Sequence, residues 1–269
     1  PFIFSAVMVV IGLWVRMKLV ESVAFTAAEK KGAIKKLPLS DTFRYHWREV
    51  TLGTFIMLAT YVLFYLMTTY ALTYGTKAQD ADPSGLGIPY TQFVLMQIIG
   101  VVFFGLFTLL SGPVADMIGR RGLLIGVTVM IILFGLSFPM FLTLRSDAMF
   151  TGGMTQAFLV IGFTLMGVTF GPMGAILPEL FPTNVRYTGS AIAYNVSSIL
   201  GAALAPIIAV ALWSKADGST WMVGVYLSIA AVLTLISLVL VKETKDTDYN
   251  LASYEDEIPD ADDLVATAV

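Results

Sequence analysis

The sequence contains no cysteine and only one histidine, His46. Disulfides and thiolate-bound metals are therefore excluded, and a single histidine cannot form a metal site by itself. Charged residues are scarce, because Asp, Glu, Lys and Arg make up 13% of the chain whereas soluble domains carry about a quarter. Hydrophobic residues make up 57%, too many for a water-soluble surface. We predict a protein of the lipid bilayer, with no metal, no cofactor and no nucleic-acid partner.

The apolar residues form seven runs, and each is long enough to cross a hydrocarbon core of about 30 Å as a helix. These runs cover residues 1–17, 50–73, 91–111, 123–144, 153–177, 188–213 and 222–241. Because a helix satisfies its own backbone hydrogen bonds in lipid, the predicted fold class is all-α, a polytopic transmembrane helix bundle. The expected organisation is a first helix at 1–17, a linker at 18–49, a six-helix domain at 50–241 and a disordered acidic tail at 242–269.

The basic residues predict the orientation, since Lys and Arg are retained on the cytoplasmic side of a membrane. If the 18–49 linker is cytoplasmic, only Lys77, Arg145 and Lys215 lie outside, which leaves thirteen of the sixteen basic residues inside. The C-terminus is then cytoplasmic as well, and the linker connects two membrane-embedded parts.

The linker is expected to form two short interfacial helices, around 21–31 and 40–50, with basic side chains near anionic headgroups. Its simplest role is that of a topology determinant and tether, and a regulatory lipid site is the alternative. Tryptophan, which forms aromatic belts at membrane surfaces, falls at three predicted helix ends, at Trp47, Trp213 and Trp221.

Polar residues recur on one face of the run 50–73. They are Thr54, Tyr61, Tyr65 and Thr68. A polar face inside a bilayer is expected to meet water or protein instead of lipid, although tyrosines also pack and hydrogen-bond between helices. The run 188–213 adds the polar residues Tyr194, Asn195 and Ser198, for which interhelical packing is again the alternative.

Three glycines and two prolines predict local features of the last runs. Gly167 and Gly171 form a G-x-x-x-G pair that favours close helix packing, and Gly174 is expected to continue the small face. Pro172 is expected to interrupt the same helix. Pro206 frees the carbonyl of Ala202, which permits a kink in its helix.

A charged motif separates the runs 91–111 and 123–144. It consists of Gly112, Asp116, Gly119, Arg120 and Arg121. The motif resembles the G-x-x-x-D-[RK]-x-G-R-R loop between the eighth and ninth helices of the major facilitator superfamily, with Met117 where the family usually has a basic residue. A glycine turn, a carboxylate able to cap a neighbouring helix and arginines able to pair with carboxylates would explain it. A positive-inside turn without mechanical function is the alternative.

A second stretch, 171–190, is more specific, with Gly171-Pro-Met-Gly, then Pro178-Glu179 and Arg186. It resembles the tenth helix, loop and eleventh helix of the metabolite:proton symporters of that superfamily, and residues 18–25 resemble the end of their sixth helix. The resemblance covers residues 1–245 and assigns the seven runs to helices six to twelve, with helices one to five absent.

The resemblance implies a secondary active transporter of the inner (plasma) membrane that moves a small organic solute, such as a carboxylate or an osmolyte, by alternating access. The residues expected to bind the solute are Tyr61, Tyr65, Thr68, Tyr194 and Asn195. Those expected to form a cytoplasmic gate are Gly112, Asp116, Gly119, Arg120, Arg121, Glu179 and Arg186, with Glu179 pairing with one of the adjacent arginines. No ionisable residue lies in the interior of any run, so proton coupling would use a group in the absent N-terminal half.

Three alternatives remain at this point. A sugar porter of the same superfamily is the nearest. A seven-helix membrane receptor or retinal protein fits the number of runs, but a retinal Schiff base needs a lysine at mid-membrane and the last run has none before Lys242. An enzyme is not expected, because the spans lack the ionisable residues that intramembrane catalysis requires.

Overall fold

The computed structural model describes residues 2–18, 38–142, 148–182 and 185–241, and the regular structure in these ranges is helical. The chain divides into two units. The first contains α1 (Phe2–Lys18), an apolar helix with exposed side chains such as Val10 and Trp14. The second unit holds the remaining helices and the candidate site. The predicted linker helix at 21–31, the acidic tail and Arg145 lie outside the described residues.

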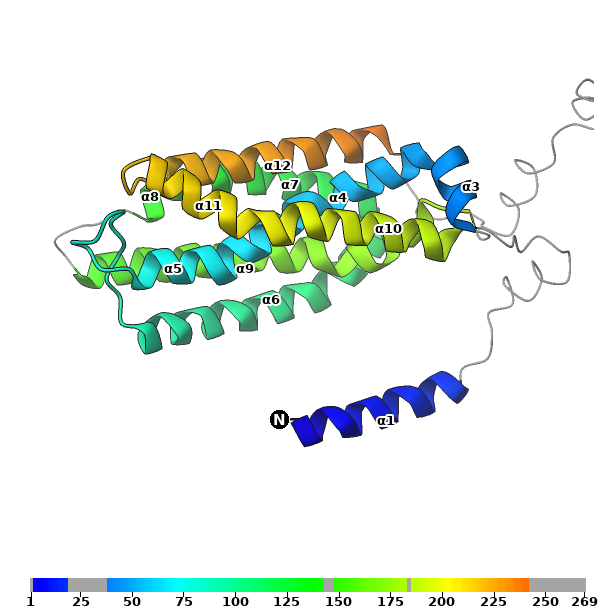
Figure 1. Cartoon of the computed structure of the whole chain (residues 1–269), viewed down its shortest axis with the longest axis horizontal. Helices are drawn as coiled ribbons and strands as arrows, with labels where there is room; N and C mark the ends of the chain where they lie inside the picture. Colours follow the sequence, from blue (N-terminus) through cyan, green and yellow to red (C-terminus); the bar gives the residue numbers. More distant parts are fainter. Residues whose placement is uncertain (1, 19–37, 143–147, 183–184, 242–269) are drawn as a thin grey trace, which may run out of the picture. The chain divides into compact units, whose positions relative to one another are not determined.

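The long helical segments of the second unit lie side by side, with consecutive segments running in opposite directions and the short α3 at one end (Figure 1). In chain order the elements are α3 (Pro38–Tyr45), α4 (Trp47–Tyr65), η1 (Leu66–Tyr70), α5 (Ala71–Thr76), α6 (Tyr90–Ile118), α7 (Arg120–Leu136), α8 (Phe138–Phe141), α9 (Ala148–Glu179), α10 (Arg186–Ser198), η2 (Ile199–Ala203), α11 (Leu204–Lys215) and α12 (Trp221–Leu240). The elements η1 and η2 are π-helical turns, which join α4 to α5 and α10 to α11.

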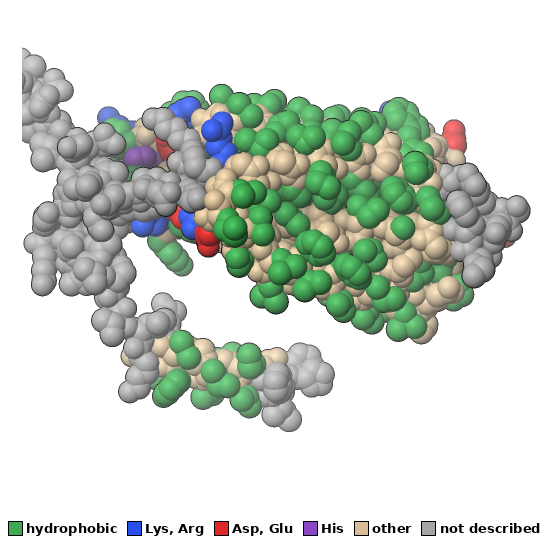
Figure 2. Space-filling view, turned by 180° about the vertical axis from the view of Figure 1, so that it is seen from behind, with side chains coloured by type: hydrophobic (Ala, Val, Ile, Leu, Met, Phe, Trp, Pro, Cys, Tyr) green, Lys and Arg blue, Asp and Glu red, His purple; other side chains and the backbone are tan. Residues whose placement is uncertain are grey.

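Among the described residues, five helices are long and apolar enough to cross a membrane by length and composition. They are Trp47–Thr76, Tyr90–Ile118, Gly152–Glu179, Arg186–Lys215 and Trp221–Leu240. The other two predicted spans correspond to α1 and α7, which have 17 residues each. Hydrophobic side chains cover the flank of the bundle while most charged side chains gather at its ends (Figure 2). These features confirm the predicted all-α transmembrane bundle.

The helix α9 packs most extensively against α6, through the predicted small face. A methyl group added to Gly167 would lie 2.5 Å from the Phe104 carbonyl oxygen, and one added to Gly171 would lie 2.7 Å from that of Thr108. The G-x-x-x-G prediction is therefore confirmed for this pair. It is wrong for Gly174, which faces open space. The predicted interruption is also wrong, because α9 continues through Pro172 to Glu179.

The predicted distortion at Pro206 coincides with η2. Proline has no N–H to donate to the carbonyl of Ala202, and this carbonyl lies within the π-helical turn. The corresponding turn η1 in the α4–α5 segment could not be predicted in this way, because that segment contains no proline. Both turns pack against the opposite segment, η2 against α4 and η1 against α11.

Trp213 does not belong to an aromatic belt, contrary to the sequence prediction. Its side chain is 2% exposed and packs edge-on against Tyr70 and Tyr74, with ring centroids 6.2 and 5.5 Å away. The Tyr74 hydroxyl in turn donates to the Leu142 carbonyl at 2.9 Å. Trp47 and Trp221 are 63% and 49% exposed, as a belt requires.

Candidate functional site

The charged motif contains a turn of one residue. Gly119 separates α6 from α7 and has a φ of +96°, a conformation that residues with a Cβ rarely adopt. Its N–H still donates to the Ala115 carbonyl at 2.9 Å, as in a regular helix, and its positive φ then turns the chain and ends α6. The prediction placed the turn from Gly112 onward, but α6 continues through Gly112 as far as Ile118. The turn therefore requires glycine only at position 119.

Arg120 joins three helix ends. As the first residue of α7, it forms an ion pair through Nη1 with Oε1 of Glu179, the last residue of α9. Its Nη2 lies 3.3 Å from Oδ1 of Asp116 on α6. The predicted pairing of Glu179 with an arginine of the motif is therefore confirmed for Arg120. The sequence suggested that the Asp116 carboxylate caps a neighbouring helix. In the structure it pairs with Arg120, four residues later in the chain.

Arg121 holds the end of a fourth helix. Its Nε donates to the Leu238 carbonyl at 2.8 Å and its Nη2 to the Val239 carbonyl at 2.9 Å. These are among the last carbonyls of α12, which have no partner within their own helix and carry the negative end of its dipole. The two adjacent arginines therefore connect the start of α7 to both α9 and α12.

Arg186 begins α10, and its Nε donates to the Phe181 carbonyl at 3.1 Å. Phe181 follows Glu179 by two residues. The hydrogen bond from Arg186 therefore holds the chain just after α9 against the start of α10. The side chains of Arg120 and Glu179 are 22% and 18% exposed. A pair with this much solvent contact is worth about 0–1 kcal/mol, which is enough to bias a conformational equilibrium but too little to hold the fold.

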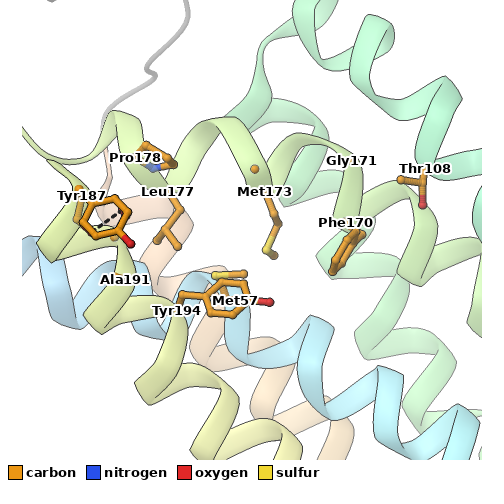
Figure 3. Close-up of a pocket in the computed structure, with 12 residues that line it drawn as sticks. Met57, Thr108, Phe170, Gly171, Met173, Leu177, Pro178, Tyr187, Ala191 and Tyr194 are labelled. Carbon is orange, nitrogen blue, oxygen red and sulfur yellow. Dashed lines mark hydrogen bonds between the residues drawn. The ribbon is translucent and has the colours of Figure 1, made fainter. Parts of the chain in front are cut away.

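A cavity of about 510 Å³ lies beside this cluster, between α4, α6, α9 and α10 (Figure 3). Its lining is mostly apolar, with a few hydroxyl groups. The lining residues are Met57, Thr108, Phe170, Gly171, Met173, Gly174, Leu177, Pro178, Tyr187, Ser190, Ala191 and Tyr194. The side chains of Met173 on α9 and Tyr194 on α10 project into the space between these helices (Figure 3).

Of the residues predicted to bind solute, Tyr194 lines this cavity and is 44% exposed. Tyr61 on α4 contacts it edge-on, with the ring centroids 5.6 Å apart. The structure thus brings together one residue from each of the two predicted polar faces.

The other three predicted binding residues have contacts within their own helices. The hydroxyl of Thr68 donates to the Phe64 carbonyl at 2.8 Å, and Nδ2 of Asn195 donates to the Ala191 carbonyl at 2.7 Å. The ring of Tyr65 packs against Phe64 at 5.1 Å. The roles of all five residues in solute binding stay predictions.

Gln97 is a polar residue that the sequence reasoning missed. From α6 its Nε2 donates to the carbonyls of Met67 and Thr68, at 2.8 and 2.9 Å, within η1. A π-helical turn disturbs the i to i−4 hydrogen bonding of the backbone, and this amide supplies donors to two of the carbonyls there. The run 91–111 contains two glutamines, Gln92 near its start and Gln97 further inside, and the inner one was the available signal.

A bundle of apolar helices with a charged turn at one end and a cavity beside it is compatible with a membrane transporter. The family model described as "Sugar (and other) transporter" matches residues 15–254. The chain belongs to this family of the major facilitator superfamily, whose members are transporters and not enzymes.

Curated relatives carry corresponding names. The chain is 48% identical to "Inner membrane metabolite transport protein YhjE" of Escherichia coli (strain K12), over 91% of this chain and 54% of the relative. It is 44% identical to a "Putative metabolite transport protein" of Haemophilus influenzae, over 92% and 56%. It is 28% identical to the "Shikimate transporter" of Escherichia coli, over 91% and 54%. The chain therefore spans about half the length of these relatives. No solved structure matched it.

Proposed function

We propose that the chain acts as the C-terminal half, with the preceding helix, of a secondary active transporter that moves a small organic solute by alternating access. A carboxylate, an osmolyte or a similar metabolite is the proposed solute. Its membership of the transporter family and the names of its relatives support this function, because two relatives are named for metabolite transport and one for shikimate. Relatives named for proline and betaine support the osmolyte class.

The observation that carries the proposal is the cavity between α4, α6, α9 and α10. Its volume of about 510 Å³ suits a small organic molecule, since ligand cavities usually measure about 300–1,000 Å³. The lining offers apolar surface from Met57 and Met173 and hydroxyl groups from Ser190 and Tyr194. This chemistry suits a solute that is held by shape and by a few directed hydrogen bonds.

The Arg120 cluster is the proposed gate at one end of this cavity. Leu177 and Pro178 line the cavity, and Glu179 follows them directly at the end of α9. When Arg120 and Glu179 are paired, α9 is tied to α6 and α7 at this end. Separation of the pair would allow the ends of these helices to part, so the pair favours the state in which this end is closed.

Proton coupling is the proposed energy source. The described spans hold ionisable side chains near their ends and tyrosines in their interior, so we place the titrating carboxylate in helices upstream of residue 1. The end of the bundle with Arg48, Arg120, Arg121 and Arg186 is the proposed cytoplasmic end, because basic residues favour that side. The C-terminus would then be cytoplasmic.

The test is uptake by proteoliposomes that contain this chain together with its upstream coding sequence. Carboxylates, betaines and sugars would be offered in turn, with and without an imposed pH gradient. We expect saturable uptake of a carboxylate or osmolyte that is faster with an inward proton gradient. Selective uptake of a sugar would favour the sugar porter, and a complete lack of uptake across the panel would argue against the proposed substrate class.

A further inference from the structure

The short helix α3 lies across one end of the bundle (Figure 1), and none of its residues lines the cavity. It ends at Tyr45, and His46, with φ −121° and ψ 23°, breaks the chain direction before α4 begins at Trp47. Thr42 is completely buried, whereas Phe43 on the same helix is exposed. One side of α3 is therefore packed against protein and another is presented outward.

Apolar and aromatic side chains are exposed on α3 and at the start of α4. Leu39, Phe43, Tyr45 and Trp47 are 55%, 55%, 62% and 63% exposed. Leu39 and Phe43 are four residues apart and share one face of α3. Such side chains at the end of a membrane-spanning bundle lie at the level where lipid acyl chains meet the headgroups, and aromatic residues are enriched there.

Two exposed arginines accompany this apolar surface. Arg44 lies on α3 with its guanidinium 5.5 Å from the centre of the Tyr45 ring, and Arg48 follows Trp47 on α4. The neighbouring carboxylate, Glu49, is partly buried and lies 4.0 Å from Nδ1 of His46. Asp41 on α3 offsets one of these charges, but the charged side chains that the structure describes as exposed beside the aromatic residues, Arg44 and Arg48, are positive, which complements a surface of anionic lipid.

We propose that α3 and Trp47 form an in-plane membrane anchor that binds anionic phospholipid headgroups through Arg44 and Arg48. The apolar side chains Leu39, Phe43 and Trp47 enter the acyl boundary, and the two guanidinium groups stay with the phosphates. The occupant of this surface is the lipid of the leaflet at this end of the bundle. The anchor fixes the start of α4, which lines the cavity, relative to the membrane plane.

The test reconstitutes the purified chain in nanodiscs that contain either brominated phosphatidylglycerol or brominated phosphatidylcholine at equal mole fraction. Bromine quenches tryptophan on contact, and the signal of Trp47 is obtained as the difference between the chain and its Trp47→Phe variant. We expect stronger quenching of Trp47 by the anionic lipid. Because each basic residue near an anionic surface strengthens binding roughly fivefold, Arg44→Gln with Arg48→Gln should remove most of this preference.

The matched control is Lys77→Gln with Lys215→Gln, which removes two positive charges at the opposite end of the bundle and should leave the preference intact. Circular dichroism of each variant verifies that it is folded. Equal quenching by the two lipids would overturn the proposal. So would an absence of quenching by either lipid, because protein or water would then cover Trp47.

Discussion

Arg120 at the start of α7 is paired with Glu179 at the end of α9, and these residues are 59 positions apart in the sequence. Neither α7 nor α9 could separate from the other at this end without breaking the pair. Because the pair borders the cavity, its strength sets how easily this end opens in the proposed transport cycle.

Replacement of Glu179 by Gln is expected to open this end more often. The chain contains no cysteine, so Ser190→Cys gives a single reporter on the cavity wall. A pair of this exposure contributes about 0–1 kcal/mol, so maleimide labelling of the reporter in the complete transporter should accelerate by up to about fivefold. Asp116→Asn is the control, because it removes the other carboxylate that pairs with Arg120. The Asp116 side chain is 66% exposed and its Oδ1 lies 3.3 Å from Arg120 Nη2, so its loss should change the labelling rate less. Equal labelling rates with Glu and Gln at position 179 would exclude a gate at this pair.

The contact between α6 and α9 predicts opposite results for two glycines in one helix. Gly171→Ala would press a methyl group against Ser111 Oγ and the Thr108 carbonyl, whereas Gly174→Ala would enter open space. Overpacking of this kind costs about 1–3 kcal/mol, so only the first variant should unfold at clearly lower temperature. Thermal unfolding in detergent measures both variants. Equal losses of stability at the two positions would contradict the packing.

The membrane spans could be predicted because hydrophobic length alone specifies them. Their ends were less predictable, as α6 continues to Ile118 although the apolar run stops near 111. A helix does not need lipid to continue, and Asp116 is compatible with helix beyond the hydrocarbon core. The interruption predicted at Pro172 is absent from α9, because a transmembrane helix tolerates proline when neighbouring groups restore its backbone interactions.

The parts that could not be predicted depend on residues distant in sequence. Trp213 is buried because Tyr70 and Tyr74 pack against it, and no local pattern indicates such partners. The pairing of Glu179 with Arg120 was predictable as one of two possibilities, because only two arginines are adjacent in the motif. The contact between Tyr61 and Tyr194 could not be derived from either helix alone.

Gln97 is expected to stabilise the bundle by holding η1. Gln97→Leu removes hydrogen bonds to the Met67 and Thr68 carbonyls, and such bonds inside membranes are worth about 0.6–2 kcal/mol. Its thermal unfolding temperature should therefore fall by several degrees. Gln92→Leu is the matched control, since Gln92 is an exposed glutamine on the same helix. An equal change in both variants would show that hydrophobicity and not the bonds to η1 determines the result.

Tyr194 allows the sharpest test of the proposed solute site, because it is the predicted binding residue that lines the cavity. Tyr194→Phe keeps the ring that packs against Tyr61 and removes only the hydroxyl. A hydrogen bond to the solute worth about 1 kcal/mol would be lost, so KM for uptake should rise about fivefold while the amount of folded protein is unchanged.

Tyr65→Phe makes the same chemical change on α4, and Tyr90→Phe makes it at the exposed start of α6, away from the cavity. A rise of KM for Tyr194 and Tyr65 but not for Tyr90 would support the sequence prediction that both faces bind solute. If Tyr194→Phe leaves KM unchanged and Tyr65→Phe raises it, the cavity is not the binding site and solute binds at the polar face of α4.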